Sequence, residues 1–326
     1  MSLTPSPIPV SGTSEDGMAD ARTAPLQNAE SKALLRDDLM ANRPKHWWQT
    51  RAARRFFRHR LALIGLGILL VMVFIAIFAP FISSDPYHGN LRMIRKAPQA
   101  GHWLGTDGAG RDVWARLAYA SRISLTVGIV AVTVATVIGL LLGSIAGYCG
   151  GKIDSLIMRF TDIILCFPTL LVILSVVTIV GPSAVNVMVI IGAFTWPGMC
   201  RLVRAQFLSL RELDYVLAAR SIGASNRAII TRHLMPNVVA PVSVAVTLGL
   251  AGAILTEAGL SFLGLSVQVP TPTWGNMLFG ATTISIIENN WWLWLPPGLA
   301  IALTVLAINF VGDGLRDALD PRMRLD

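Results

Sequence analysis

Long apolar runs constrain the fold of this chain more than any other feature of its sequence. A helix that crosses the hydrocarbon core of a bilayer needs about 20 predominantly apolar residues. Six runs approach or meet this length: Leu61–Ile82, Ile123–Tyr148, Ile163–Val180, Ala184–Met199, Val238–Leu255 and Leu293–Val311. Only 14% of the residues are charged, whereas soluble domains carry about a quarter. We therefore predict an all-α polytopic membrane protein with six transmembrane helices.

The distribution of basic residues predicts an orientation, because Lys and Arg next to membrane spans are retained in the cytoplasm. Residues 43–60 precede the first run and contain no acidic residue. Their basic residues are Arg43, Lys45, Arg51, Arg54, Arg55, Arg58 and Arg60. Alternation of the spans then places both termini and residues 201–236 in the cytoplasm. Residues 83–122 are predicted to be external, although they contain six basic residues.

Changes of composition divide the chain into five segments. Residues 1–44 lack an apolar core and are rich in Pro, Ser, Ala and Thr, which predicts a disordered cytoplasmic tail without a cleavable signal peptide. The remaining segments are 45–100 (basic juxtamembrane segment, first span and start of the outer loop), 101–122 (outer-loop GTDGAGRD segment), 123–312 (transmembrane domain with spans two to six) and 313–326 (cytoplasmic C-terminus).

The sequence predicts no catalytic, cofactor or metal site. Cys149, Cys166 and Cys200 have neither disulfide nor zinc spacing. The stretch "GYCGGKI", Gly147–Ile153, lacks the first Gly and the Ser/Thr of a phosphate-binding loop. The net charge is +8, but the basic residues flank apolar runs, so nucleic acid is not a predicted partner. Uphill transport would need energy from a partner subunit.

Ionisable groups inside a bilayer are costly, about 2.5–3.5 kcal/mol each at a helix centre on insertion scales, and they mark transport pathways. Only Asp162 and Glu257 come close to the membrane interior, and both lie at predicted span ends. We expect Glu257 to face water; the alternative is that it lines an outer vestibule. The lack of central acidic or His residues disfavours a self-sufficient ion-coupled transporter, which remains the alternative class.

Span two carries two overlapping GxxxG patterns at Gly139, Gly143 and Gly147. Such small residues let neighbouring helices approach closely. We therefore predict helix packing at this face, against the alternative that the glycines are scattered without a packing role.

The basic segment "DYVLAARSIGASNRAIITRHLMP" belongs to the longest predicted cytoplasmic connection, 201–236. Asp214 is the predicted N-cap of a first short helix. Tyr215, Ala218, Ala219 and Ile222 follow at helical spacing on one predicted face.

A second short helix is predicted after a bend. Gly223 fits the left-handed residue that ends the first helix, and Ser225 is the predicted cap of Asn226–Leu234, which should end before Pro236. A rigid helix that exposes Tyr and Ala predicts docking into a protein groove. The alternative is a basic loop on anionic lipid, which the six arginines of 201–236 would favour.

The outer segment "GTDGAGRD" predicts a turn. Thr106 and Asp107 form its capped part, Gly108 and Gly110 provide backbone freedom, and a helix begins at Asp112 and lies against the outer bilayer surface.

The stretch "LAARSIGASNRAIITRHLMP" resembles the EAA loop of binding-protein-dependent ABC importer permeases. The matching positions are Ala218, Ala219, Gly223 and Pro236. Leu217, His233 and Met235 stand where that loop has Glu, Ile and Leu.

Three other stretches are similar to signatures of the C-type permease subunit of the dipeptide and oligopeptide branch. They are "HWLGTDGAGRDVWARLAYASRISL" (His102–Leu125), "EAGLSFLGLSVQVPTPTWGNML" (Glu257–Leu278) and "GDGLRDALDPRMR" (Gly312–Arg324). The resemblance extends from about residue 45 to residue 326 and leaves out the N-terminal tail.

The resemblance implies a type I ABC importer permease fold in the bacterial inner membrane, with 123–312 as the ABC importer transmembrane domain. It implies a homologous B-type permease, two ABC ATPase subunits that hold ATP and magnesium, and an external solute-binding protein as partners besides lipid. The chain itself would be a non-catalytic subunit without a cofactor. Its implied substrates are di- or oligopeptides, with nickel or another small solute as the alternative; no His, Cys or Met cluster marks a metal path.

The resemblance also assigns the candidate site residues. The coupling helix that docks on an ATPase would comprise Asp214, Tyr215, Ala218, Ala219, Arg220, Ile222, Gly223 and Pro236. For the outer loop on the side of the binding protein we predict Asp107, Gly110, Arg111, Asp112 and Arg116, with Arg111 and Arg116 meeting headgroups or that protein.

Overall fold

The computed structural model describes residues 51–319, so the predicted tail, 1–44, and the last residues of the C-terminal segment lie outside the described part. Every regular element within 51–319 is a helix. In chain order they are α2 (Arg51–Arg58), α3 (Arg60–Ile82), η2 (Leu91–Met93), α4 (Val113–Cys149), α5 (Gly151–Leu165), α6 (Thr169–Val180), α7 (Ala184–Leu210), α8 (Asp214–Ser221), α9 (Asn226–Ala228), η3 (Ile229–Leu234), α10 (Met235–Phe262), α11 (Trp274–Phe279), α12 (Ile284–Asn289) and α13 (Trp291–Leu319). The predicted all-α class is confirmed. The packing described below is that of the unit that begins at Arg54.

Five of the described helices are long and apolar enough to cross a membrane, namely α3, α4, α7, the continuous helix Asn226–Phe262 and α13. The pair α5 and α6 is bent by 81° at a short break, and it brings the number of spans to six if the two helices cross the membrane as one broken span. The predicted third span, Ile163–Val180, is therefore not one straight helix. Pro168 explains the break, because proline lacks an amide hydrogen and disfavours helical geometry in the residue before it.

The remaining spans are longer than their apolar runs. Span two begins at Val113 instead of Ile123, because Asp112 caps the helix there by accepting a hydrogen bond from the amide of Ala115 at 2.8 Å. Span four continues through Pro197 to Leu210. Hydropathy identifies only the apolar part of a helix that lies in the hydrocarbon core of the bilayer. The polar residues that extend these helices at their ends were therefore not predicted.

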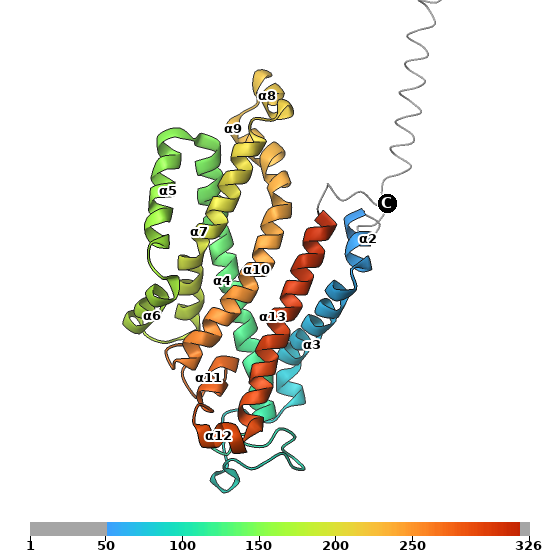
Figure 1. Cartoon of the computed structure of the whole chain (residues 1–326), viewed down its shortest axis with the longest axis vertical. Coiled ribbons are helices and arrows are strands. Elements are labelled where there is room, and N and C mark those ends of the chain that lie inside the picture. Colours follow the sequence, from blue (N-terminus) through green and yellow to red (C-terminus); the bar gives the residue numbers. More distant parts are fainter. Residues whose placement is uncertain (1–50, 320–326) are drawn as a thin grey trace, which may run out of the picture. The chain divides into compact units, whose positions relative to one another are not determined.

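α4 packs along α7 and also contacts α3, α5 and α10, while α13 packs against α3 and α10 (Figure 1). Small residues allow the closest of these approaches. A Cβ atom at Gly139, Gly143 or Gly147 would lie only 2.6 Å from the Cβ of Met199, 2.6 Å from the carbonyl oxygen of Cys200, and 2.5 Å from the Cβ of Phe207, respectively. All three glycines of the GxxxG patterns therefore face α7.

The two ends of this unit differ in structure. α8 and α9 lie at one end, while α11, α12 and the loop before α4 lie at the opposite end (Figure 1). We call these the α8 end and the α11 end.

Candidate functional site

The first helix of the α8 end begins one residue earlier than predicted. Leu213 has extended backbone angles and occupies the N-cap position, so Asp214 is the first helical residue and not the cap. The amides of Val216 and Leu217 bond to the carbonyl oxygen of Leu213 at 2.9 and 3.1 Å. The carboxylate of Asp214 still lies in the first turn, where negative charge is favourable.

The predicted single face of α8 is divided between the protein and its surroundings. Val216 and Ala219 are buried, and Val216 packs in an apolar cluster with Phe207 of α7 and Leu234 of η3. Ala219 is only 8% exposed, so it offers little surface to a partner. Residues three apart share a helix face, which is why these two positions turn inward together.

The outward side of α8 is apolar and basic. Its exposed apolar side chains are Leu213, Tyr215, Leu217 and Ile222, and Ile222 is 86% exposed. Ala218 and Arg220 are exposed beside them. Exposed apolar groups on a rigid helix are the pattern of a protein-docking surface.

The predicted bend at Gly223 is confirmed. Its φ is +84°, in the left-handed region, and its amide bonds to the carbonyl oxygen of Arg220 at 3.0 Å. A Cβ at this position would meet no atom within 4 Å, so the backbone conformation alone favours glycine. Ser225 then caps α9 as predicted, since its hydroxyl accepts from the amide of Ala228 at 3.3 Å.

The second helix does not end before Pro236. α9 passes into η3, a π-helical turn, and then directly into α10, so this predicted boundary is wrong. In the π turn the amide of Met235 bonds to the carbonyl oxygen of Ile230, five residues earlier. Pro236 lies in the first turn of α10, where a missing amide hydrogen is tolerated.

Side-chain hydrogen bonds fasten the α8 end to the long helices. Arg211 Nη1 donates to the carbonyl oxygen of Gly147 at 3.1 Å, and the hydroxyl of Tyr148 bonds to Asn226 Oδ1 at 2.6 Å. Below them, Arg204 of α7 forms a two-pronged ion pair with Asp154 of α5. Sequence reasoning missed these contacts, which make the segment a fixed extension of α4, α7 and α10.

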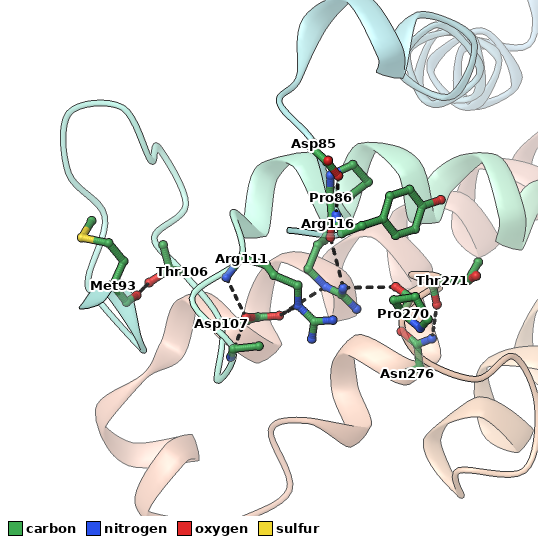
Figure 2. A network of polar contacts seen from close by, with 12 residues as sticks. Asp85, Pro86, Met93, Thr106, Asp107, Arg111, Arg116, Pro270, Thr271 and Asn276 are labelled. Carbon is green, nitrogen blue, oxygen red and sulfur yellow. Dashed lines mark hydrogen bonds and ion pairs between the residues drawn. The ribbon is translucent and has the colours of Figure 1, made fainter. Parts of the chain in front are cut away.

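At the α11 end, Asp107 organises the GTDGAGRD turn (Figure 2). Its Oδ1 accepts from the amides of Ala109 and Arg111 at 2.8 and 2.9 Å, and its Oδ2 accepts from Arg111 Nε at 2.8 Å. Gly110 has a φ of +72°, and a Cβ there would collide with the carbonyl of Asn90. Gly108 has no positive φ, so only one of the two predicted glycines uses its backbone freedom.

Arg116 does not meet headgroups or a partner. Asp112 starts α4 itself, not a helix on the bilayer surface, and this buries Arg116 to 3% exposure. Its Nε lies 3.4 Å from Asp107 Oδ2, and its Nη1 donates to the carbonyl oxygens of Pro86 and Pro270, each at 3.4 Å (Figure 2). The Arg111 side chain is also mostly buried. A buried arginine needs such partners.

Two cavities lie within the described part of the chain, one at the α11 end and one between the long helices. One, of about 260 Å³, is bounded by the Asp107 turn and Arg116 on one side and by Asn276, Met277 and Phe279 of α11 on the other. The second, of about 380 Å³, lies between α4, α7 and α10. Its polar lining consists of Thr136, Thr195 and Thr256.

Glu257 is fully buried, which overturns the expectation that it faces water. α10 continues to Phe262, so Glu257 lies within the helix and not at its end. Its carboxyl oxygens accept from the hydroxyls of Ser124 on α4 at 3.2 Å and Ser261 at 2.7 Å. The four-residue spacing of Glu257 and Ser261 was visible in the sequence, whereas nothing there indicated Ser124.

Comparison with protein families supports the sequence resemblance. Residues 139–325 match the model of the binding-protein-dependent transport system inner membrane component, and residues 47–98 match the N-terminal transmembrane domain of oligopeptide transport permease C.

Curated relatives agree with these matches over most of the chain. The dipeptide transport system permease protein DppC of Alkalihalophilus pseudofirmus is 45% identical over 274 residues, which cover 84% of this chain and 90% of the relative. A putative peptide permease protein of Brucella suis is 42% identical over 85% of this chain and 92% of its own length. DppC of Bacillus subtilis is 40% identical over 86% of this chain and 88% of its own length.

The helical fold, the GTDGAGRD turn and these matches agree along the chain. A family model covers more than half of the sequence, and relatives at 40–45% identity align over nearly their whole length. The chain therefore belongs to the binding-protein-dependent ABC importer permeases, as a multi-pass inner-membrane subunit of the C type found in the dipeptide and oligopeptide branch.

Proposed function

We propose that this chain forms half of the translocation pathway for di- or oligopeptides in an ATP-driven importer and couples that pathway to cytoplasmic ATPase subunits. The observation that carries the proposal is the α8 segment: a short helix with exposed Tyr215, Leu217 and Ile222, held rigidly on α4, α7 and α10. The printed names of the relatives support the peptide substrate.

The proposed orientation has the α8 end and both termini in the cytoplasm. The α8 end carries exposed Arg220 and Arg227, together with Arg232 in η3, while residues 234–315 contain no Lys or Arg. The positive-inside rule favours this arrangement. The basic residues Arg111 and Arg116 of the outer loop argue against this orientation only weakly, because both form ion pairs with Asp107.

Coupling would work through rigid-body contact. Ile222 and Leu217 fit an apolar groove of an ATPase, and the bonds of Arg211 and Tyr148 transmit movement of that groove to α4 and α10. ATP and magnesium belong to the ATPase subunits, and this subunit is non-catalytic. A B-type permease would complete the pathway, and an external binding protein would deliver the peptide at the α11 end.

The energy source separates this function from an ion-coupled transporter. The experiment measures uptake of a radiolabelled dipeptide into proteoliposomes that contain both permeases, both ATPases and the binding protein. Uptake should require internal ATP and persist when ionophores collapse the proton and sodium gradients. Uptake that continues without the ATPases and stops with the gradients would contradict the proposal.

A further inference from the structure

Glu257 lies where α10, α4 and the start of α11 meet. The side chains of Glu257 on α10, Ser124 on α4 and Thr273 before α11 are completely buried, and Ser261 is nearly so. Together they connect α10 and α4 with α11, the short helix that bounds the cavity of about 260 Å³.

The hydrogen bonds form two chains that converge on the carboxyl group. In the first, the amide of Trp274 donates to Ser124 Oγ at 3.3 Å, and Ser124 donates to Glu257 Oε2 at 3.2 Å. An amide can only donate, so it occupies an acceptor site of the serine and leaves the single hydroxyl hydrogen for Glu257.

The second chain has the same polarity. The amide of Asn276 donates to Thr273 Oγ1 at 3.1 Å, Thr273 donates to Ser261 Oγ at 3.2 Å, and Ser261 donates to Glu257 Oε1 at 2.7 Å. Both backbone donors belong to the first turn of α11. The carboxyl group of Glu257 accepts at both of its oxygens, and through the two chains it sets the orientation of this turn.

Other bonds hold the opposite side of the same segment. Asn276 Nδ2 donates to the carbonyl oxygen of Thr271 at 2.7 Å, and Arg116 donates to that of Pro270 (Figure 2). α11 is thus fixed from the cavity side by Arg116 and Asn276 and from the helix bundle by Glu257. No apolar residue at position 257 could replace the second attachment.

We propose that Glu257 is a positioning residue that fixes α11 as one wall of the outer cavity, so that the liganded binding protein meets a preformed surface. The role in binding-protein recognition rests on the proposed function, whereas the fixing of α11 can be tested without transport. Glu257→Gln places an NH₂ group where one oxygen accepted, and it should loosen one chain without changing the size of the side chain.

The first measurement is the rate at which a membrane-impermeant maleimide labels Met277→Cys in a cysteine-free full-length chain within the assembled complex. Met277 lines the cavity and is only 9% exposed, and Phe279→Cys, at an exposed position, serves as the reference. Glu257→Gln and Ser124→Ala should each raise the labelling rate about tenfold, the shift expected for the loss of one buried hydrogen bond. Ser121→Ala is the matched control, because that buried hydroxyl bonds only to its own helix, at Leu117.

The second measurement is the concentration of liganded binding protein that gives half-maximal stimulation of ATP hydrolysis. It should rise about tenfold in Glu257→Gln and Ser124→Ala, with the unstimulated rate unchanged. If Glu257→Gln fails to insert, Thr273→Val interrupts the second chain and takes its place.

Unchanged labelling in Ser124→Ala and in the second-chain variant would overturn the positioning role. Raised labelling with an unchanged half-maximal concentration would overturn the role in recognition. Failure of the proposed function is a separate result, since the unmutated complex would then show no stimulation while the labelling differences remained.

Discussion

Arg211 Nη1 donates a hydrogen bond to the carbonyl oxygen of Gly147 at 3.1 Å, which joins the end of α7 to the last turn of α4. Carbonyls in a last helical turn lack partners within their own helix. The bond therefore gives the carbonyl oxygen of Gly147 a hydrogen-bond partner. It also attaches Arg211, which lies just before α8, to the last turn of α4. This relationship makes the α8 segment an extension of the bundle.

Arg211→Met should weaken this attachment while keeping the length of the side chain. A hydrogen bond from a charged group contributes about 1.5–3 kcal/mol when buried, and less here because the Arg211 side chain is partly exposed. We expect stimulated ATP hydrolysis of the complex to fall about threefold to tenfold. Glu212→Gln, which alters only the exposed partner of Arg211, is the control; an equal loss there would show that the Gly147 bond is unimportant.

Gly223→Val should damage the bend between α8 and α9. The left-handed conformation costs a residue with a side chain about 1–2 kcal/mol and is least favourable for β-branched residues. Gly223→Asn should be milder, since Asn tolerates this region. In limited proteolysis of the assembled complex, Gly223→Val should be cleaved faster at this bend than Gly223→Asn. Equal cleavage of the two variants would refute the conformational explanation.

Gly143→Val should separate α4 from α7. The added Cβ would lie 2.6 Å from the backbone oxygen of Cys200, which cannot move aside as a side chain does. Overpacking of this kind costs about 1–3 kcal/mol, so the unfolding midpoint in detergent should fall. Gly198→Val on α7, where a Cβ meets no atom within 4 Å, should leave the midpoint nearly unchanged. A comparable fall in both would argue against close packing.

Asp107→Asn should unfold the outer turn. Arg116 would then be buried without its charged partner, and breaking a buried ion pair costs about 3–5 kcal/mol. Accessibility of an engineered thiol at Ala109 measures the loosening. Asp85→Asn removes an exposed carboxylate of the same loop and should not increase labelling; increased labelling in that control alone would contradict the assigned role of Asp107.

Local features of the sequence predicted local structure well. Gly223 and Ser225 were assigned correctly because a left-handed residue and an N-cap depend on few neighbours. The helix was predicted to end before Pro236, because proline usually interrupts a helix. It continues in the structure because a π turn precedes the proline, and nothing in the sequence indicated that turn. Likewise the prediction treated Ile163–Val180 as one span and missed both the break at Pro168 and the 81° bend there.

The burial of single charged groups could not be predicted from the sequence. Glu257 was expected in water, yet its partner Ser124 lies 133 positions away along the chain. Arg116 was expected at the surface, yet a carbonyl 154 positions away completes its contacts. Ala219 was predicted to lie on the docking face, but its inward direction depends on how α8 packs against α7 and η3.

The central claim, that the α8 segment docks on an ATPase, is tested most directly by Ile222→Asp. The measurement is ATP hydrolysis by the reconstituted complex with and without liganded binding protein. Ile222 is 86% exposed and supports no internal packing, so the variant should insert and pair normally but lose stimulation, because its carboxylate would be buried in an apolar groove. Arg227→Gln, on the exposed side of α9, should retain most of it. Full stimulation of Ile222→Asp would contradict the claim and leave the segment as a basic anchor on lipid.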